Sequence, residues 1–126
     1  MTRQMPATST KTSTPLRVRL RLFHGDEAAL GPGRVELLGR IAEGGSVQQA
    51  AREMELSYMK AWKLIQSMNR CFRAPLVELR RGGKDGGSAL LTDTGRAVLT
   101  IYRDMEHRAR EASEPGAAEL ARLLAP

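Results

Sequence analysis

Residues 46–72, SVQQAAREMELSYMKAWKLIQSMNRCF, constrain the fold most, because they contain two helix starts only a few residues apart. Ser46 can cap a helix over 47–54, and Ser57 can cap a second helix that extends to the end of this stretch. Only Met-Glu-Leu separates the two periodic runs, and the small pair Ala50-Ala51 would let the helices approach closely. The pattern is typical of a helix-turn-helix, although other αα-hairpins share it.

The second helix has two chemically different faces. Its apolar stripe follows the spacing of three and four residues and consists of Tyr58, Ala61, Trp62, Ile65, Met68 and Phe72. The opposite side carries Lys60, Lys63, Ser67 and Arg70. Tyr58 and Met59 fit either the core or the outer face, and for Tyr58 we expect the core.

Positive charge is concentrated around this helix. The formal net charge of the chain is +6, and residues 57–84 alone contain seven cations and one acid, Glu78. The cations are Lys60, Lys63, Arg70, Arg73, Arg80, Arg81 and Lys84. A solvated surface usually mixes the two signs, so this segregation predicts an anionic partner, and DNA is the partner that a helix-turn-helix fits.

The glycine-rich run RRGGKDGG, residues 80–87, lies between two short strand patterns, LVELR and SALL. It is not a nucleotide P-loop, because Ser88 stands where that motif needs lysine and a strand rather than a helix follows. A hairpin directly after a helix-turn-helix predicts the wing of a winged helix, whose Arg80, Arg81 and Lys84 could contact DNA phosphates or the minor groove. The alternative is a solvated turn without a binding role.

The N-terminal part predicts a strand and a further helix. Residues 16–23, LRVRLRLF, alternate between apolar and arginine side chains, as in a half-buried strand. HGDEAALGPG follows as a loop, and a helix is predicted over 32–43, with Pro32 in its first turn and Gly44-Gly45 at its end. We expect an α+β, mainly helical fold in which the N-terminal strand joins the wing hairpin in one small antiparallel sheet.

A long helix is predicted over 92–112, with Thr92 as its cap. Its apolar stripe is longer than a small core can cover, which predicts dimerisation through Val98, Ile101, Tyr102, Met105 and Ala109. The run 113–116 should break this helix, leaving a short helical extension within 113–126. The predicted winged-helix domain therefore spans residues 16–112.

Other functional classes find little support in the sequence. Residues 1–15 lack the apolar run of a secretory signal and suggest a disordered tail, and no run of 18 apolar residues predicts a membrane span. Cys71 is the only cysteine, and His24 and His107 have no partner at metal-ligand spacing. No nucleophile–base pair or cofactor motif is present. We therefore expect a cytoplasmic, non-enzymatic protein without a metal or cofactor.

Two longer stretches carry a family resemblance. GRVELLGRIAEGGSVQQAAREMELSYMKAWKLIQSMN and LVELRRGGKDGGSALLTDTGRAVLTIY resemble the N-terminal DNA-binding domain of the ModE family of molybdate-dependent regulators, and more distantly the LysR-type winged helix. The resemblance implies a homodimer that binds palindromic double-stranded DNA. Where the family usually has SYKSAW, this chain has SYMKAW, which moves one cation by about 100° around the helix.

The resemblance assigns DNA contacts to three segments. Within these segments we expect contacts from Ser57, Tyr58, Met59, Lys60, Lys63 and Ser67 in the recognition helix, from Ser46, Gln48 and Gln49 in the supporting helix, and from Arg80, Arg81 and Lys84 in the wing. In the ModE family, molybdate is bound by domains that follow this region, so we do not expect this chain to sense molybdate. The alternative function is an interaction protein that dimerises with a full-length regulator or a separate sensor and modulates it.

Overall fold

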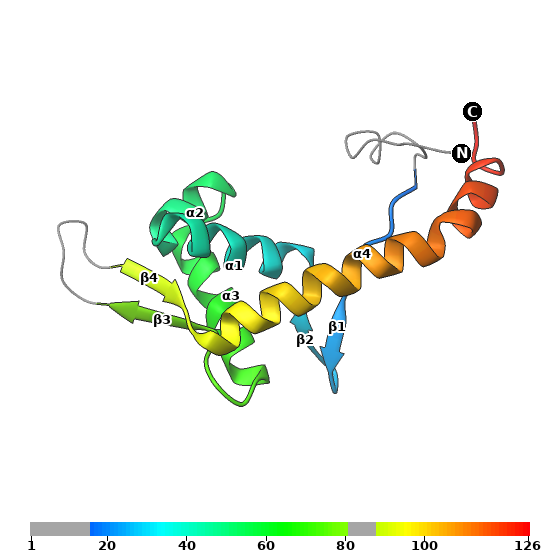
Figure 1. The fold of residues 1–126 in the computed structure, drawn as a ribbon. Helices are drawn as coiled ribbons and strands as arrows, with labels where there is room; N and C mark the ends of the chain where they lie inside the picture. Colours follow the sequence, from blue (N-terminus) through cyan, green and yellow to red (C-terminus); the bar gives the residue numbers. More distant parts are fainter. Residues whose placement is uncertain (1–15, 81–87) are drawn as a thin grey trace.

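The computed structural model describes residues 16–80 and 88–126. Within these residues the chain forms four helices, α1 (Pro32–Gly44), α2 (Val47–Glu53), α3 (Tyr58–Cys71) and α4 (Asp93–Ala121). Two separate antiparallel sheets accompany them, one of β1 (Leu22–His24) with β2 (Glu27–Leu30), the other of β3 (Val77–Arg80) with β4 (Ser88–Leu91). The arrangement is a winged helix-turn-helix with a projecting C-terminal helix, which confirms the predicted fold class (Figure 1).

The N-terminal region differs from the prediction. The predicted strand over 16–23 is reduced to β1, which pairs with β2 and not with the wing, and β2 lies in the stretch predicted as loop. Gly25 adopts a φ of 64°, which allows a two-residue turn that places His24 opposite Glu27. Residues 16–21 still alternate between half-buried apolar side chains and exposed arginines, but they form no ladder.

Local signals explain where the first three helices begin and where α1 ends. Pro32 occupies the first turn of α1, and Gly45 ends it with a φ of 74° and an N–H donated to the carbonyl of Ile41. The Oγ of Ser46 accepts the N–H of Gln49 at 3.0 Å, and the Oγ of Ser57 accepts the N–H of Lys60 at 3.0 Å. The predicted bounds of α1, α2 and α3 are confirmed to within two residues.

The turn between α2 and α3 is tight. Leu56 donates its N–H to the carbonyl of Ala51 at 2.8 Å, and Glu55 takes a left-handed φ of 59° to reverse the chain. Ala50 and Ala51 are buried, as the predicted close approach of the two helices requires. The orientation of α3 relative to α2 is therefore set by backbone hydrogen bonding and by small side chains at the contact.

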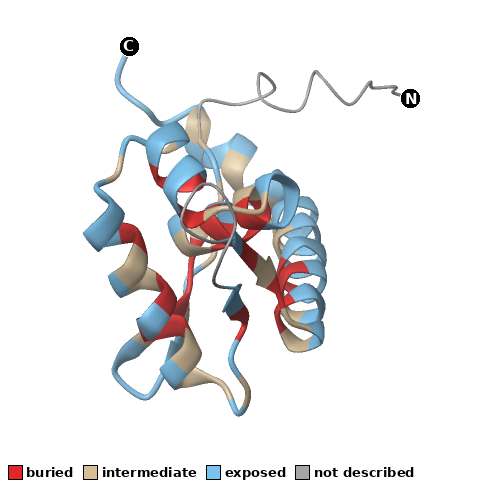
Figure 2. Ribbon diagram, turned by 90° about the vertical axis from the view of Figure 1, so that its left-hand side faces the viewer, coloured by how far each residue is buried: buried red, intermediate tan, exposed pale blue. Residues whose placement is uncertain are grey.

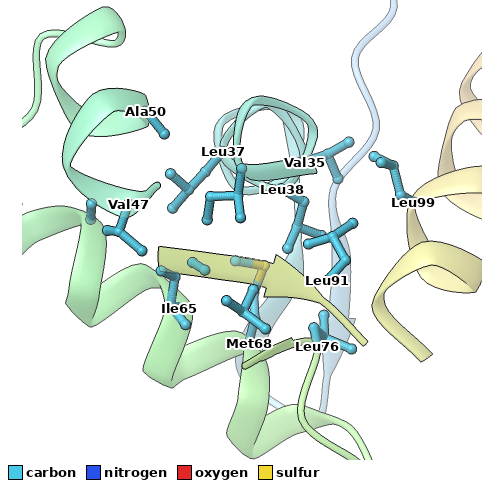
Figure 3. Close-up of a cluster of buried hydrophobic side chains, with 14 of the residues drawn as sticks. Val35, Leu37, Leu38, Val47, Ala50, Ile65, Met68, Leu76, Leu91 and Leu99 are labelled. Carbon is cyan, nitrogen blue, oxygen red and sulfur yellow. The ribbon is translucent and has the colours of Figure 1, made fainter. Parts of the chain in front are cut away.

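One apolar core joins all of these elements. It receives side chains from α1, α2, α3, β4 and α4, and the residues labelled in Figure 3 are Val35, Leu37, Leu38, Val47, Ala50, Ile65, Met68, Leu76, Leu91 and Leu99. The wing is attached to this body through β4, because Ala89 is buried and donates its N–H to the carbonyl of Gly45 at 2.9 Å. The base of the wing is thereby held beside the start of α2.

Helix α4 is longer than predicted. Thr92 caps it as expected, but the helix continues through Ser113–Gly116 to Ala121, so the predicted break is wrong. Pro115 removes one backbone hydrogen bond, whose acceptor would be the carbonyl of Glu111. Glu111 is exposed, so water can bind this carbonyl, and the surrounding alanine, glutamate and leucine residues favour a helix. The distal half of α4 extends away from the core (Figure 1) and is mostly exposed (Figure 2).

Candidate nucleic-acid interface

The outer face of α3 presents one continuous row of exposed side chains. Met59, Lys63, Gln66 and Arg70 follow one another at spacings of four, three and four residues, so they share one side of the helix. Lys60, in the first turn of α3, is also exposed. The opposite side of α3 is anchored in the core by Ala61, Ile65 and Met68, each with no exposed surface. The row is therefore held in a defined orientation.

Tyr58 and Met59 lie outside the core. Tyr58 is 50% exposed and packs edge-on against Trp62, with 6.2 Å between the ring centroids. The expectation that Tyr58 is a core residue is therefore wrong, because its ring packs against the half-buried Trp62 at the edge of the core while half of its own surface stays exposed. Met59 is 64% exposed. Both side chains are available to a partner.

Ser67 does not belong to the exposed surface. Its exposed fraction is 9%, and its Oγ accepts a hydrogen bond from Arg34 Nη2 and donates one to Glu27 Oε2, both at 3.4 Å. The β1–β2 hairpin and α1 cover this position. The sequence pattern placed Ser67 on the outer face and did not select Gln66, although Gln66 completes the spacing that begins at Met59.

The three predicted residues of the supporting helix have different surroundings. Ser46 uses its hydroxyl to cap α2, and Gln48 is exposed. Gln49 donates from Nε2 to Glu53 Oε2 at 3.0 Å, and Glu53 also pairs with Arg40 at 3.0 Å. The hydrogen bond from Gln49 and the guanidinium of Arg40 lower the pKa of Glu53. Gln49 thus belongs to a polar contact that ties α2 to α1.

The electrostatics of α3 are more uneven than the sequence suggests. In the described ranges, none of the ion pairs includes Lys60, Lys63 or Arg73. Arg70, in contrast, pairs with Glu27 of β2, with 3.0 Å between Nη2 and Oε2. The hydrogen bond from Arg70 lowers the pKa of Glu27, so this carboxylate is ionised at neutral pH. The N-terminal half of α3 is cationic, and its C-terminal end is locally neutralised.

The wing strands β3 and β4 follow α3 in the chain. Arg80 ends β3 opposite Ser88, and Glu78 and Leu79 on the same strand are exposed. The predicted contacts Arg81 and Lys84 lie outside the described residues. Of the three predicted wing cations, only Arg80 therefore lies within the described residues.

Cys71 closes α3 but is a poor candidate for reactivity. Burial, followed by the negative charge of Glu27, raises the pKa of the Cys71 thiol, so the thiol stays protonated at neutral pH.

Among the described residues, no group of three or more histidine, cysteine, aspartate or glutamate side chains is placed to hold a metal ion. Likewise, no helix in residues 16–80 or 88–126 has the length and apolarity needed to cross a membrane.

The predicted dimerisation stripe on α4 divides into buried and exposed parts. Tyr102 is 1% exposed and donates its hydroxyl to the carbonyl of Leu20 at 2.7 Å, so it packs within its own chain. Val98 packs against the core, and Ala109 is half-buried. Ile101 and Met105 remain exposed, at 57% and 38%. The part of the stripe that a second protein could cover is therefore Ile101 and Met105.

Comparison with known proteins agrees with this geometry. The family model of bacterial regulatory helix-turn-helix proteins of the lysR family matches residues 33–96, which include α1, the helix-turn-helix and the wing. The chain is similar to the molybdenum transport protein ModE of Azotobacter vinelandii, with 39% identity over 95 residues, 75% of this chain and 35% of that protein. This similarity confirms the resemblance to ModE-type proteins.

Two further relatives show the same partial coverage. The DNA-binding transcriptional dual regulator ModE of Escherichia coli K12 is 42% identical over 71 residues, 56% of this chain and 27% of that protein. The molybdenum-pterin-binding protein MopB of Rhodobacter capsulatus is 44% identical over 79 residues, 63% of this chain and 29% of that protein. The chain thus spans about a third of the length of these curated relatives.

Proposed function

Because this chain belongs to the LysR-type family of bacterial helix-turn-helix regulators, we propose that it regulates transcription by binding specific sequences in double-stranded DNA. The observation that carries this proposal is the exposed row on α3, with Met59 and Lys63 beside Lys60 and no intramolecular ion pair on either lysine in the described chain. From Met59 to Arg70 the row is about 16 Å long at 1.5 Å per residue, enough to cross several base pairs of the major groove.

In this proposal the exposed face of α3, the N-termini of α2 and α3, and the wing have different roles. Lys63 and Met59 lie on a helix anchored in the core, so they can contact base edges at fixed positions. Ser46 and Ser57 mark the N-termini of α2 and α3, where backbone N–H groups favour phosphate, and exposed Gln48 can add a phosphate contact. Arg80, with Arg81 and Lys84 as sequence-based candidates, supplies phosphate or minor-groove contacts from the wing.

The proposal is tested by measuring DNA binding directly. Double-stranded fragments that co-purify with the protein at low salt are sequenced, and fluorescence anisotropy then compares the enriched sequence with a scrambled one across a salt series. We expect the enriched sequence to bind at least about a thousandfold more tightly, and both affinities to fall with salt. Equal affinity for the two sequences would contradict sequence-specific recognition, and no binding at low salt would contradict DNA binding altogether.

The protein is also proposed to act as a homodimer on a palindromic site. Ile101 and Met105 continue the row of Val98 along α4 beyond the core, and the exposed leucines Leu120, Leu123 and Leu124 lie at its distal end. Exposed apolar side chains on a projecting helix are typical of a helix-mediated contact between chains. Two copies would place two α3 helices on two half-sites.

Replacing Ile101 with aspartate should separate the dimer, because the new carboxylate would be buried without a partner in the contact. We expect light scattering to report the mass of one chain for Ile101→Asp and of two chains for the wild type. Affinity for a palindrome should fall by about a hundredfold, while affinity for a single half-site should change little.

Thr100→Asp is the matched control for this variant. Thr100 is exposed but lies about 100° around α4 from Ile101, off the row of Val98, Ile101 and Met105, so the same charge there should leave the dimer intact. A wild-type protein that is monomeric at micromolar concentration would contradict the homodimer. If it then formed a stable complex with a full-length ModE-type regulator, the modulating role of an interaction subunit would be favoured instead.

A further inference from the structure

The β1–β2 hairpin places a carboxylate at one end of the α3 surface. Glu27, the first residue of β2, lies 43 residues before Arg70 in the sequence, and its Oε2 is 3.0 Å from Arg70 Nη2. The same oxygen accepts the hydroxyl of Ser67 at 3.4 Å. The carboxylate therefore contacts two residues of α3, one at the covered edge and one in the exposed row.

Arg70 belongs to the same row as Lys63. The two residues are seven positions apart, which is close to two helical turns, so Arg70 lies about 10 Å further along the same side of α3. Both side chains of the Arg70–Glu27 pair are partly accessible, with exposed fractions of 64% and 46%. A phosphate could therefore reach Arg70, but it would meet a guanidinium whose charge is already matched by a carboxylate.

We propose that Glu27 limits the attraction of this protein for DNA of arbitrary sequence by neutralising Arg70 at the C-terminal end of the α3 row. This inference rests on the proposed DNA-binding function. Affinity for arbitrary DNA depends on the number of cations that can displace counterions from phosphates. Glu27 removes one such cation from each chain, while Met59 and Lys63 in the N-terminal half of α3 remain free to contact bases. Glu27 is thus a specificity-determining residue that does not itself need to touch DNA.

The test uses Glu27→Gln, which keeps the shape of the side chain and an oxygen that can accept from Ser67, but removes the charge. We expect this variant to bind scrambled double-stranded DNA roughly three- to tenfold more tightly at about 0.1 M salt, with a plot of log affinity against log salt steeper by about 0.9 per chain. Fluorescence anisotropy across a salt series measures both quantities.

Asp26→Asn is the control for net charge. Asp26 is the neighbouring residue, is exposed, and takes part in none of the ion pairs found in the described chain. Its neutralisation changes the net charge of the protein by the same amount but frees no cation of α3. We expect its salt dependence to equal that of the wild type. If Glu27→Gln and Asp26→Asn behave alike, the effect is one of overall charge and the inference is wrong.

The double variant Glu27→Gln/Arg70→Gln gives a second, independent readout. It replaces a neutral pair by another neutral pair, so its affinity for scrambled DNA should match that of the wild type. If the double variant instead lost the affinity for scrambled DNA that one phosphate contact contributes, Arg70 would already bind DNA in the presence of Glu27. This result would overturn the inference. Failure of the wild-type protein to bind any DNA at low salt would instead overturn the proposed function, so the two failures are distinguishable.

Discussion

Replacing Gly95 with alanine is expected to lower the free energy of unfolding by about 3 kcal/mol, because there is no room for the added methyl group. A Cβ at this position would overlap the carbonyl oxygen of Leu76 and lie 3.0 Å from its carbonyl carbon. Both atoms are backbone, so no side-chain rotation can relieve the contact. The first turn of α4 would have to move away from the segment that precedes β3.

Hydrogen bonds on both sides oppose such a movement. Leu76 donates its N–H to Asn69 Oδ1 at 2.8 Å, and its carbonyl accepts the N–H of Thr92 at 2.9 Å. The Thr92 hydroxyl donates to the carbonyl of Pro75 at 2.7 Å and accepts the N–H of Gly95 at 2.9 Å. Displacement of α4 would therefore break its N-terminal cap as well as its packing against the core.

Gly39→Ala is the matched control, because Gly39 is a second buried helical glycine with a different neighbour. Its added Cβ would lie 2.7 Å from Arg103 Nη2, the far end of a flexible side chain that can move aside. Alanine also favours a helix over glycine by about 1 kcal/mol, so this variant should be as stable as the wild type or more stable. Urea unfolding measures the free energy of unfolding of both variants. Equal stability of Gly95→Ala and Gly39→Ala would show that α4 adapts easily at its start.

Replacing Lys63 with alanine is expected to weaken binding to the specific DNA sequence by about 2 kcal/mol in each half-site, roughly thirtyfold, and to relax base preference at one position. Lys63 is exposed in the α3 row, next in sequence to Leu64 and two residues before Ile65, which has no exposed surface. Its backbone position is therefore fixed relative to DNA once α3 is docked. On scrambled DNA the loss should be smaller, because only phosphate attraction is removed.

Two comparison variants separate base recognition from charge. Arg108→Ala removes one cation from the exposed surface of α4, where Arg108 pairs with Asp104, and should leave DNA binding nearly unchanged. Arg80→Ala in the wing should weaken binding to specific and scrambled DNA by similar factors and reduce the dependence on salt. Fluorescence anisotropy with the specific and the scrambled DNA measures the affinities of all three variants. Equal losses on both DNAs for Lys63→Ala would show that Lys63 contacts phosphate and not a base.

Local patterns were sufficient to predict the helix-turn-helix. Ser46 and Ser57 accept N–H groups three residues later in the chain, and Gly45 ends α1 through a hydrogen bond four residues back. These interactions span less than two helical turns, so the residues within each segment determine them. The Gly25-Asp26 pair is an equally local signal for the turn of the β1–β2 hairpin, so the loop predicted for this stretch is wrong for a local reason.

Local sequence patterns thus predict where the helices of the helix-turn-helix lie and which face of α3 is apolar, whereas contacts between distant segments set which polar residues remain exposed. Ser67 is covered and Arg70 is neutralised because Glu27, in the β1–β2 hairpin, contacts both of them from 40 and 43 residues earlier in the chain. Tyr102 packs within its own chain because Leu20, 82 residues away, accepts its hydroxyl. Helical periodicity shows that a side chain faces an apolar or a polar environment, but the segment that supplies this environment is set by the packing of distant parts of the chain.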